Sequence, residues 1–378
     1  MENKIRFLHT ADLHLGAAVS SSPSVANERR QEALLTLERL FSICKTNEIP
    51  LLLIAGDLLE NNSVEPKFFE SFLRQIMLHP EITIAFSAGN HDPLTADSPF
   101  LNYKLPENLI VLGTEDECRE LKNLPVRIYG KSFSGVYMGG KNNFSIPAIE
   151  DEKLNIMVVH GDFAGDASGE YNPISKQFIE FSRMDYIALG HIHAFSAPEK
   201  LGKTYFAYPG THEPHGFDET GVKGVIVGEI SKTDFRYEFV PTARRRYETE
   251  NIDISEAANS SEATEIIKNA LKEKFGETYE VNFYKIILEG EISADVQLDT
   301  EEIGARLRDN IYFVKLRDNT VPRTDLQILR NENSLKGKFT NILLERIENA
   351  DESEKEKLEK ALIIGLKAFS SQVKYNED

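Results

Sequence analysis

The apolar run from Pro50 to Ala55 constrains the fold of this chain more than any other stretch. Such a run fits a strand covered on both faces, as in a parallel sheet between other layers. It ends in Gly56 and Asp57, so a carboxylate follows the strand directly. Amphipathic helices are predicted over residues 28–45 and 66–78, because apolar residues recur there every three or four positions. The alternation of strands and helices indicates a layered α/β fold.

The other predicted strands of this first part also end in polar residues of the same kind. In layered α/β proteins, ligands gather outside the carboxyl ends of the strands, so we expect these side chains to meet. They offer carboxylate, imidazole and amide groups, and no thiolate. The set comprises Asp12, His14, Asp57, Asn90, His160, His191 and His193.

A mixed nitrogen and oxygen donor set suits Mn²⁺, Fe²⁺ or Zn²⁺ better than Mg²⁺ alone. Seven donors are too many for one ion, so the set predicts two divalent ions about 3.5–4 Å apart. Asp57 is the natural bridge, because one carboxylate has two oxygens to share. Such a centre can hold a phosphodiester and activate the water that attacks phosphorus.

The order of the motifs carries a family resemblance. Asp-x-His, Gly-Asp, Gly-Asn-His-Asp, His-Gly and Gly-His-x-His follow one another as they do in the calcineurin-like metallophosphoesterases. Within that superfamily the chain resembles the SbcD-like DNA repair exonucleases. Residues 9–16, 188–193 and 208–219 carry this closer resemblance.

The resemblance implies a role for each residue. His91 would contact the scissile phosphate and assist the leaving group, and Asp92 would orient His91. One ion would be held by Asp12, His14, Asp57 and His193, and the other by Asp57, Asn90, His160 and His191. The family favours manganese, with Fe²⁺, Zn²⁺ and Mg²⁺ as alternatives.

The resemblance also implies a four-layer α/β/β/α sandwich with a smaller C-terminal α/β capping domain and a helical tail. We therefore expect a metallophosphoesterase (nuclease) domain over residues 1–242 and a capping, DNA-contacting domain over 243–335. A charged helical C-terminal region would occupy residues 336–378. The expected partners are DNA and an SMC-like ATPase subunit, with a homodimer as a further expectation.

Composition leaves the substrate open. The net charge of −18 argues against a generic nucleic-acid-coating protein, so DNA contact would depend on local patches. A phosphodiesterase or phosphatase for a nucleotide or other small molecule is the alternative, and a non-enzymatic scaffold that recruits an ATPase is a third. Two cysteines, the lack of an export signal and the lack of an apolar run of about 20 residues predict a cytoplasmic protein without a membrane span.

Several residues outside the motifs receive simpler interpretations. Glu213 is expected to be solvated, and Val222–Ile230 is expected to join Thr204–Tyr208 in a second sheet. The basic run Arg244–Arg246 could hold DNA phosphates or pair with acidic groups of the protein, and both interpretations stay open. Structural or supporting roles are expected for His9, His79, His212 and His215.

Overall fold

The computed structural model describes residues 3–18, 22–139, 144, 148–163, 169–293, 296, 298–323 and 326–369. The chain divides into two compact units, Met1–Arg246 and Tyr247–Asp378. The three-part division at residues 242 and 335 stays a prediction. None of the helices in the described ranges is long and apolar enough to cross a membrane.

The first sheet of the first unit carries three of the predicted motifs. Its strands are β1 (Ile5–Thr10), β2 (Leu51–Ala55), β3 (Thr83–Ser87), β4 (Leu109–Val111), β11 (Gly224–Ile230) and β12 (Phe235–Pro241). They lie in the order β12-β11-β1-β2-β3-β4, with β1 to β4 parallel and β11 antiparallel to both of its neighbours. The prediction that Val222–Ile230 joins the second sheet was wrong. The apolar sequence of a strand does not indicate which neighbouring strand it pairs with.

The second sheet carries the two remaining histidine motifs. Its strands are β5 (Glu117–Glu120), β6 (Val126–Lys131), β7 (Leu154–His160), β8 (Tyr186–Gly190), β9 (Glu199–Leu201) and β10 (Thr204–Ala207). The order is β5-β6-β7-β8-β10-β9, with β6, β7, β8 and β10 parallel and an antiparallel strand at each edge.

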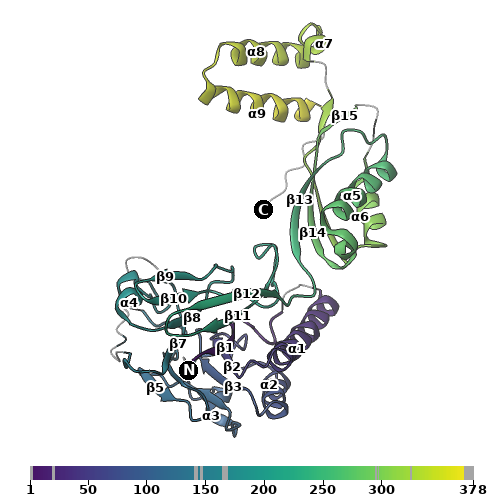
Figure 1. Cartoon of the computed structure of the whole chain (residues 1–378). Helices are drawn as coiled ribbons and strands as arrows, with labels where there is room; N and C mark the ends of the chain where they lie inside the picture. The colour runs from purple at the N-terminus through teal and green to yellow at the C-terminus, as the bar shows by residue number, and fades with distance from the viewer. Residues whose placement is uncertain are drawn as a thin grey trace. The chain divides into compact units, whose positions relative to one another are not determined.

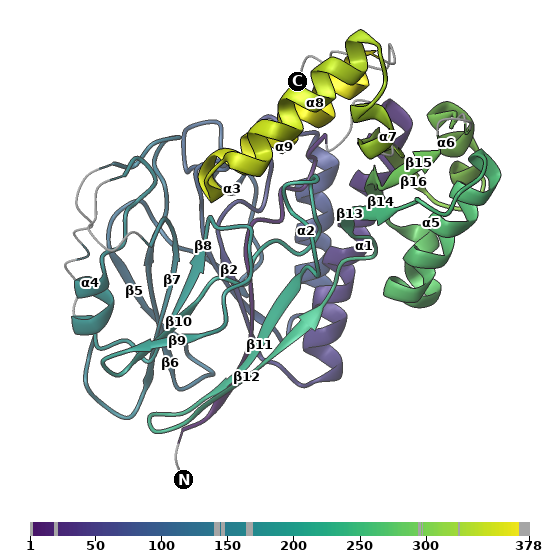
Figure 2. The same cartoon turned by 90° about the horizontal axis from the view of Figure 1, so that it is seen from above.

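Apolar side chains fill the space between the two sheets and the space outside them. Phe7, Leu53, Ile128, Val158 and Tyr186 belong to the fully buried cluster between the sheets. Helices α1 (Pro23–Thr46) and α2 (Pro66–Leu78) pack on the outer face of the first sheet, and α4 (Lys176–Phe181) packs on that of the second. Figure 2 shows this arrangement, with α1 and α2 on one side and α4 on the other. The predicted four-layer α/β/β/α sandwich is confirmed. A short helix, α3 (Pro99–Asn102), precedes β4.

The second unit has its own sheet and core. Strands β13 (Tyr247–Asp253), β14 (Phe283–Glu289) and β16 (Phe313–Asp318) form a parallel sheet in the order β13-β14-β16. Helices α5 (Ser260–Phe275) and α6 (Thr300–Arg308) cover one of its faces (Figure 1). This confirms the smaller C-terminal α/β domain. A 3-10 helix (Gly276–Val281) follows α5, and β15 (Glu291–Ser293) pairs with β17 (Val321–Arg323).

Three helices complete the second unit. They are α7 (Leu326–Arg330), α8 (Leu335–Asn349) and α9 (Glu352–Phe369). A small apolar cluster joins them, with Leu329, Leu343, Leu362 and Leu366 at its centre. The Ser334 side chain accepts a hydrogen bond from the Gly337 N–H and so caps the start of α8.

Candidate metal centre

The seven predicted ligands all follow strands at the same edge of the sandwich. Asp12 and His14 follow β1, Asp57 follows β2, and Asn90 follows β3 in the first sheet. In the second sheet His160 ends β7, and His191 and His193 follow β8. The sheets approach closely here, because a Cβ on Gly190 would lie 1.8 Å from the carbonyl oxygen of Ala55. The strand ends of both sheets therefore face one small volume.

The backbone at this edge is strained in a way that few other residues share. Asp12, His14, Asp57 and His191 have positive φ angles of 52°, 43°, 49° and 109°. Non-glycine residues rarely adopt this conformation, and such residues cluster at functional sites. The buried strands on either side hold these turns in place, which is how the sandwich can maintain them.

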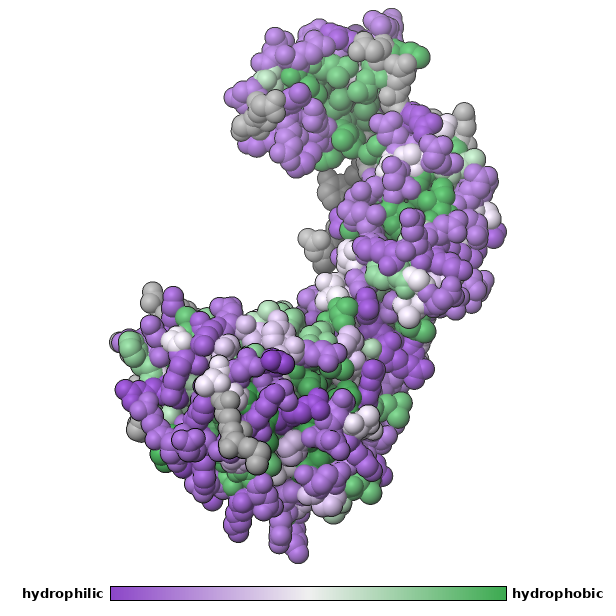
Figure 3. All heavy atoms as spheres, viewed as in Figure 1, coloured by the Kyte–Doolittle hydropathy of each residue, from purple (hydrophilic) through white to green (hydrophobic). Residues whose placement is uncertain are grey.

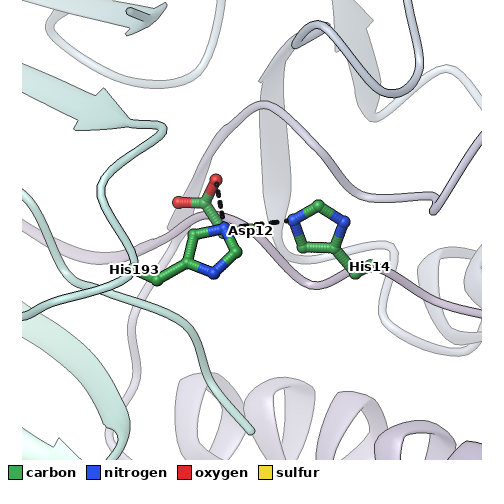
Figure 4. A group of neighbouring side chains, drawn as sticks. All are labelled: Asp12, His14 and His193. Carbon is green, nitrogen blue, oxygen red and sulfur yellow. Dashed lines mark hydrogen bonds and ion pairs between the residues drawn. The ribbon is translucent and has the colours of Figure 1, made fainter. Parts of the chain in front are cut away.

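Asp12, His14 and His193 form the first group of donors (Figure 4). The Nε2 atoms of His14 and His193 lie 3.3 Å apart, and the Nε2 atom of His193 lies 3.8 Å from Oδ1 of Asp12. The Nδ1 atom of His14 bonds Glu60 Oε2 at 3.0 Å, and that of His193 bonds Glu219 Oε1. When both Nδ1 atoms donate to carboxylates, the two Nε2 atoms present lone pairs to each other. A cation between them resolves this repulsion.

Asn90, His160 and His191 form the second group, and Asp57 lies between the two groups. The Nδ1 atom of His160 donates to the carbonyl oxygen of Ala55 at 2.9 Å. Its Nε2 atom then faces two further acceptors, Asn90 Oδ1 at 3.0 Å and Asp57 Oδ2 at 3.3 Å. The same Asp57 oxygen lies 3.8 Å from Nε2 of His14. Converging acceptors without a donor fit a second cation, and Asp57 lies within reach of both groups.

The electrostatics of this region also attract positive charge. Burial opposes protonation of His14, but the hydrogen bond with Glu60 and the charges of Asp57 and Asp12 outweigh it and raise the pKa of His14 to about 9. Burial also opposes protonation of His160, yet Asp57 and Asp12 raise its pKa to about 9. The neighbouring histidines in turn overcome burial and lower the pKa of Asp57. The donor set therefore fits two divalent ions, which would replace these protons.

His91 stands beside the first group. Its backbone N–H donates to Asp57 Oδ1 at 2.9 Å, and its exposed ring meets the His14 ring edge-on at 4.6 Å. The Nδ1 atom of the ring lies 3.0 Å from the carbonyl oxygen of Glu60. The ring therefore borders the first donor group, and its contact with a substrate stays a prediction.

Asp92 binds backbone N–H groups. Its carboxylate is fully buried and accepts hydrogen bonds from the backbone N–H groups of Leu58, Leu59 and Gly89. It thus ties the loop after β2 to the loop after β3. The carbonyl oxygen of Glu60 lies beside Nδ1 of the His91 ring, and the orienting role of Asp92 stays a prediction.

An open cavity of about 280 Å³ borders the first donor group. It can admit a substrate to His91 and to the first donor group. Three of its ionisable lining residues, Glu60, His215 and Glu219, were not among the predicted site residues. The lining comprises His14, Ala17, Ala18, Glu60, His91, His193, His215 and Glu219.

The loop that supplies His215 and Glu219 is anchored by buried charges. Glu213 is 2% exposed, so the prediction that it is solvated was wrong. It pairs with Arg29 of α1 at 2.9 Å and accepts a hydrogen bond from Thr36 at 2.7 Å. Arg245 is also buried and pairs with Glu28 and Glu32, so this member of the basic run binds protein carboxylates.

The remaining histidines hold the fold together in different ways. His9 is buried, with its ring nitrogens against the Tyr186 hydroxyl at 3.0 Å and the Leu189 carbonyl at 3.1 Å. His212 is fully buried beside the anchored loop. His79 stacks on Phe41 at the end of α2, away from the donor groups. Residues 208–219 carry part of the closer family resemblance, and this was the signal in the sequence that could have located His215 and Glu219.

Comparisons with known proteins agree with this geometry. The model of the calcineurin-like phosphoesterase family matches residues 5–195, a range that includes all seven predicted ligands. The chain is 25% identical over 283 residues to the uncharacterized metallophosphoesterase YhaO of Bacillus subtilis, across 71% of this chain and 68% of YhaO. It is 27% identical over 274 residues to the DNA double-strand break repair protein Mre11 of Methanopyrus kandleri, across 62% of this chain and 56% of that protein.

Among solved structures, the purple acid phosphatase PPD1 from yellow lupin is similar with a TM-score of 0.38 at 11% identity, over 63% of this chain and 52% of that chain. The calcineurin-like phosphoesterase YfkN from Bacillus subtilis is similar with a TM-score of 0.36 at 13% identity, over 64% of this chain and 89% of that chain. The family match spans the first, second and third strands and both histidine motifs of the second sheet. The chain belongs to the calcineurin-like phosphoesterase family.

Proposed function

We propose that this phosphoesterase is a metal-dependent DNA nuclease of the SbcD-like repair branch. The observation that carries the proposal is the convergence of two donor groups on Asp57, with His91 exposed beside them on an open cavity. The similarity to a protein named for DNA double-strand break repair supports DNA as the substrate. This chain spans about half the length of that relative, so the comparison supports the chemistry more than the whole biological role.

The residues divide the work of phosphodiester hydrolysis between them. Two divalent ions held by the seven donors would activate water and offset the charge of the phosphate. We propose manganese, the metal that the family resemblance implies; the mixed nitrogen and oxygen donors also fit Fe²⁺ and Zn²⁺. The Glu60 carbonyl fixes Nδ1 of His91, which leaves Nε2 to contact a phosphate oxygen and to hold a proton for the leaving oxygen.

End-labelled hairpin and blunt duplexes, incubated with Mn²⁺, Mg²⁺ or Zn²⁺, test the proposal and separate exonuclease from endonuclease cleavage. We expect cleavage with Mn²⁺, and we expect His91→Ala to lower its rate by about 10²–10⁴-fold while the protein keeps its bound metal. His79→Ala is the matched control, since His79 lies away from the donor groups. No cleavage of any duplex, hairpin or single strand by the wild-type protein would contradict the proposal.

A small phosphodiester is the second candidate substrate, and the cavity wall favours it. Glu60 and Glu219 line the cavity, and the whole chain carries a net charge of −18. Acidic walls repel a polyanion outside the metal positions more than they repel a single phosphodiester. Fast hydrolysis of bis-(p-nitrophenyl) phosphate and of a cyclic nucleotide, without DNA binding at moderate salt, would identify this substrate class.

We further propose that the C-terminal helices bind an SMC-like ATPase. Leu335 and Ile342 of α8 and Ile364 of α9 are more than half exposed, and Figure 3 shows hydrophobic side chains gathered on this helical part. Exposed apolar groups of this kind mark protein-binding surfaces. Copurification of the ATPase with the wild-type chain, and its loss with Ile342→Glu, would support this assignment. Equal copurification with both chains would contradict it.

A further inference from the structure

We propose that the two metal positions bind unequally, and that Glu60 and Glu219 are positioning residues that make one of them the tighter. The first position is defined by Asp12, His14 and His193, and the second by Asn90, His160 and His191, with Asp57 shared. The inference rests on the metal set of the proposed function but not on DNA as the substrate.

At the first position both histidine ligands are backed by carboxylates. Glu60 Oε2 lies 3.0 Å from Nδ1 of His14, and Glu219 Oε1 bonds Nδ1 of His193. A carboxylate behind a metal-binding histidine fixes the tautomer, orients the ring and raises the basicity of the ligand nitrogen. The two glutamates also add two negative charges close to an ion at this position, besides those of Asp12 and Asp57.

At the second position the supporting groups are neutral. Nδ1 of His160 donates to the carbonyl oxygen of Ala55, and the His191 ring packs against Tyr171 with ring centres 5.0 Å apart. Asn90 itself is a neutral ligand. The buried Asp92 lies nearby, but its oxygens already accept three backbone hydrogen bonds. Asp12 lies near both positions, since its Oδ1 atom is 3.9 Å from Nδ1 of His160, so the two positions differ chiefly in the charges of Glu60 and Glu219.

The position of Glu219 is itself fixed on three sides. Besides His193, it accepts the backbone N–H of His215 at 2.8 Å and lies 3.2 Å from Nδ1 of the His215 ring. The loop that carries it is held to α1 through the buried pair of Glu213 and Arg29. A carboxylate held this firmly loses little conformational freedom when the ion binds. The entropy cost of ordering Glu219 is therefore small and does not offset its support of His193.

Manganese titration of the full-length wild-type protein, followed by calorimetry and by the electron paramagnetic resonance of Mn²⁺, tests the inference. We expect a tight step with the spectrum of an isolated ion, followed by a weaker step with the spectrum of a coupled pair. Glu219→Gln and Glu60→Gln should each raise the dissociation constant of the tight step by about 10–100-fold. Asp218→Asn is the matched control, because this exposed neighbour in the same loop loses the same charge and should leave both steps unchanged.

Ligand variants locate the tight step. His14→Ala should remove it, and His191→Ala should remove the weaker step and leave a single isolated ion. The inference is overturned if His191→Ala loses the tight step, or if the Glu219→Gln titration coincides with that of Asp218→Asn. Thermal melting without metal verifies that each variant is folded. If Glu219→Gln does not fold, Glu60→Gln provides a second test, because the Glu60 side chain is 36% exposed. A protein that shows this pattern but cleaves no DNA would refute the proposed nuclease function alone.

Discussion

Replacing Gly190 with alanine tests whether the close contact between the sheets builds the metal centre. An added Cβ would lie 1.8 Å from the carbonyl oxygen of Ala55 and 2.8 Å from the Cβ of Ala11. An ordinary contact begins at 3.4 Å, so the strands must separate by about 1.6 Å. Overpacking of a buried site costs about 1–3 kcal/mol, and a clash with backbone places this variant at or above the upper end.

The same displacement should disturb metal binding. The Ala55 carbonyl accepts the hydrogen bond from His160, and Ala11 directly precedes Asp12. We therefore expect Gly190→Ala to lower the free energy of unfolding by about 3 kcal/mol in urea denaturation followed by circular dichroism. Mn²⁺ affinity should fall as well.

Gly135→Ala is the control for this prediction. An added Cβ there meets nothing within 4 Å, and the unfolding free energy should change by at most about 0.5 kcal/mol. Equal stability and equal Mn²⁺ affinity of Gly190→Ala and the wild type would refute the reasoning.

Three further predictions concern buried ionisable groups. Burial lowers the pKa of His9 from 6.5 to about 3. Between these pH values His9 is protonated in the unfolded chain and neutral in the folded chain. Stability should fall as the pH falls, and His9→Asn should reduce the slope of unfolding free energy between pH 4 and 6 by about 1.4 kcal/mol per pH unit, measured by urea denaturation. Mn²⁺ at about 100 times its dissociation constant should stabilise the protein by about 2.7 kcal/mol in thermal melts, and Asp57→Asn should abolish this gain; an undiminished gain would contradict the shared role of Asp57. Arg245→Ala removes one buried partner of Glu32, which keeps Arg29, and should cost about 1.5–3 kcal/mol, the range for a hydrogen bond to a charged group; Arg236→Ala breaks an exposed pair and should cost at most about 1 kcal/mol, and equal losses would refute the distinction.

The local chemistry of this protein is legible in its sequence. Leu51–Ala55 is apolar throughout because both faces of β2 are covered. Asp57 follows this run closely in the sequence, so its place at the strand end could be predicted from the run. Helix α2 begins at Pro66 and ends at Leu78, because a first-turn proline and a regular apolar stripe leave little choice. Local propensity and periodicity fix such features, so the strand ends and their ligand types could be predicted.

Relations between distant segments were decided only by the tertiary structure. Glu219 supports His193 and Glu60 supports His14, yet nothing in the sequence pairs either glutamate with its histidine. Asp92 binds backbone N–H groups, and β11 joins the first sheet, because both outcomes depend on which segments fold against each other. The sequence determines which groups reach the strand ends. Packing of the two sheets determines which of them touch, since hydrogen-bond partners far apart in the chain leave no local pattern to read.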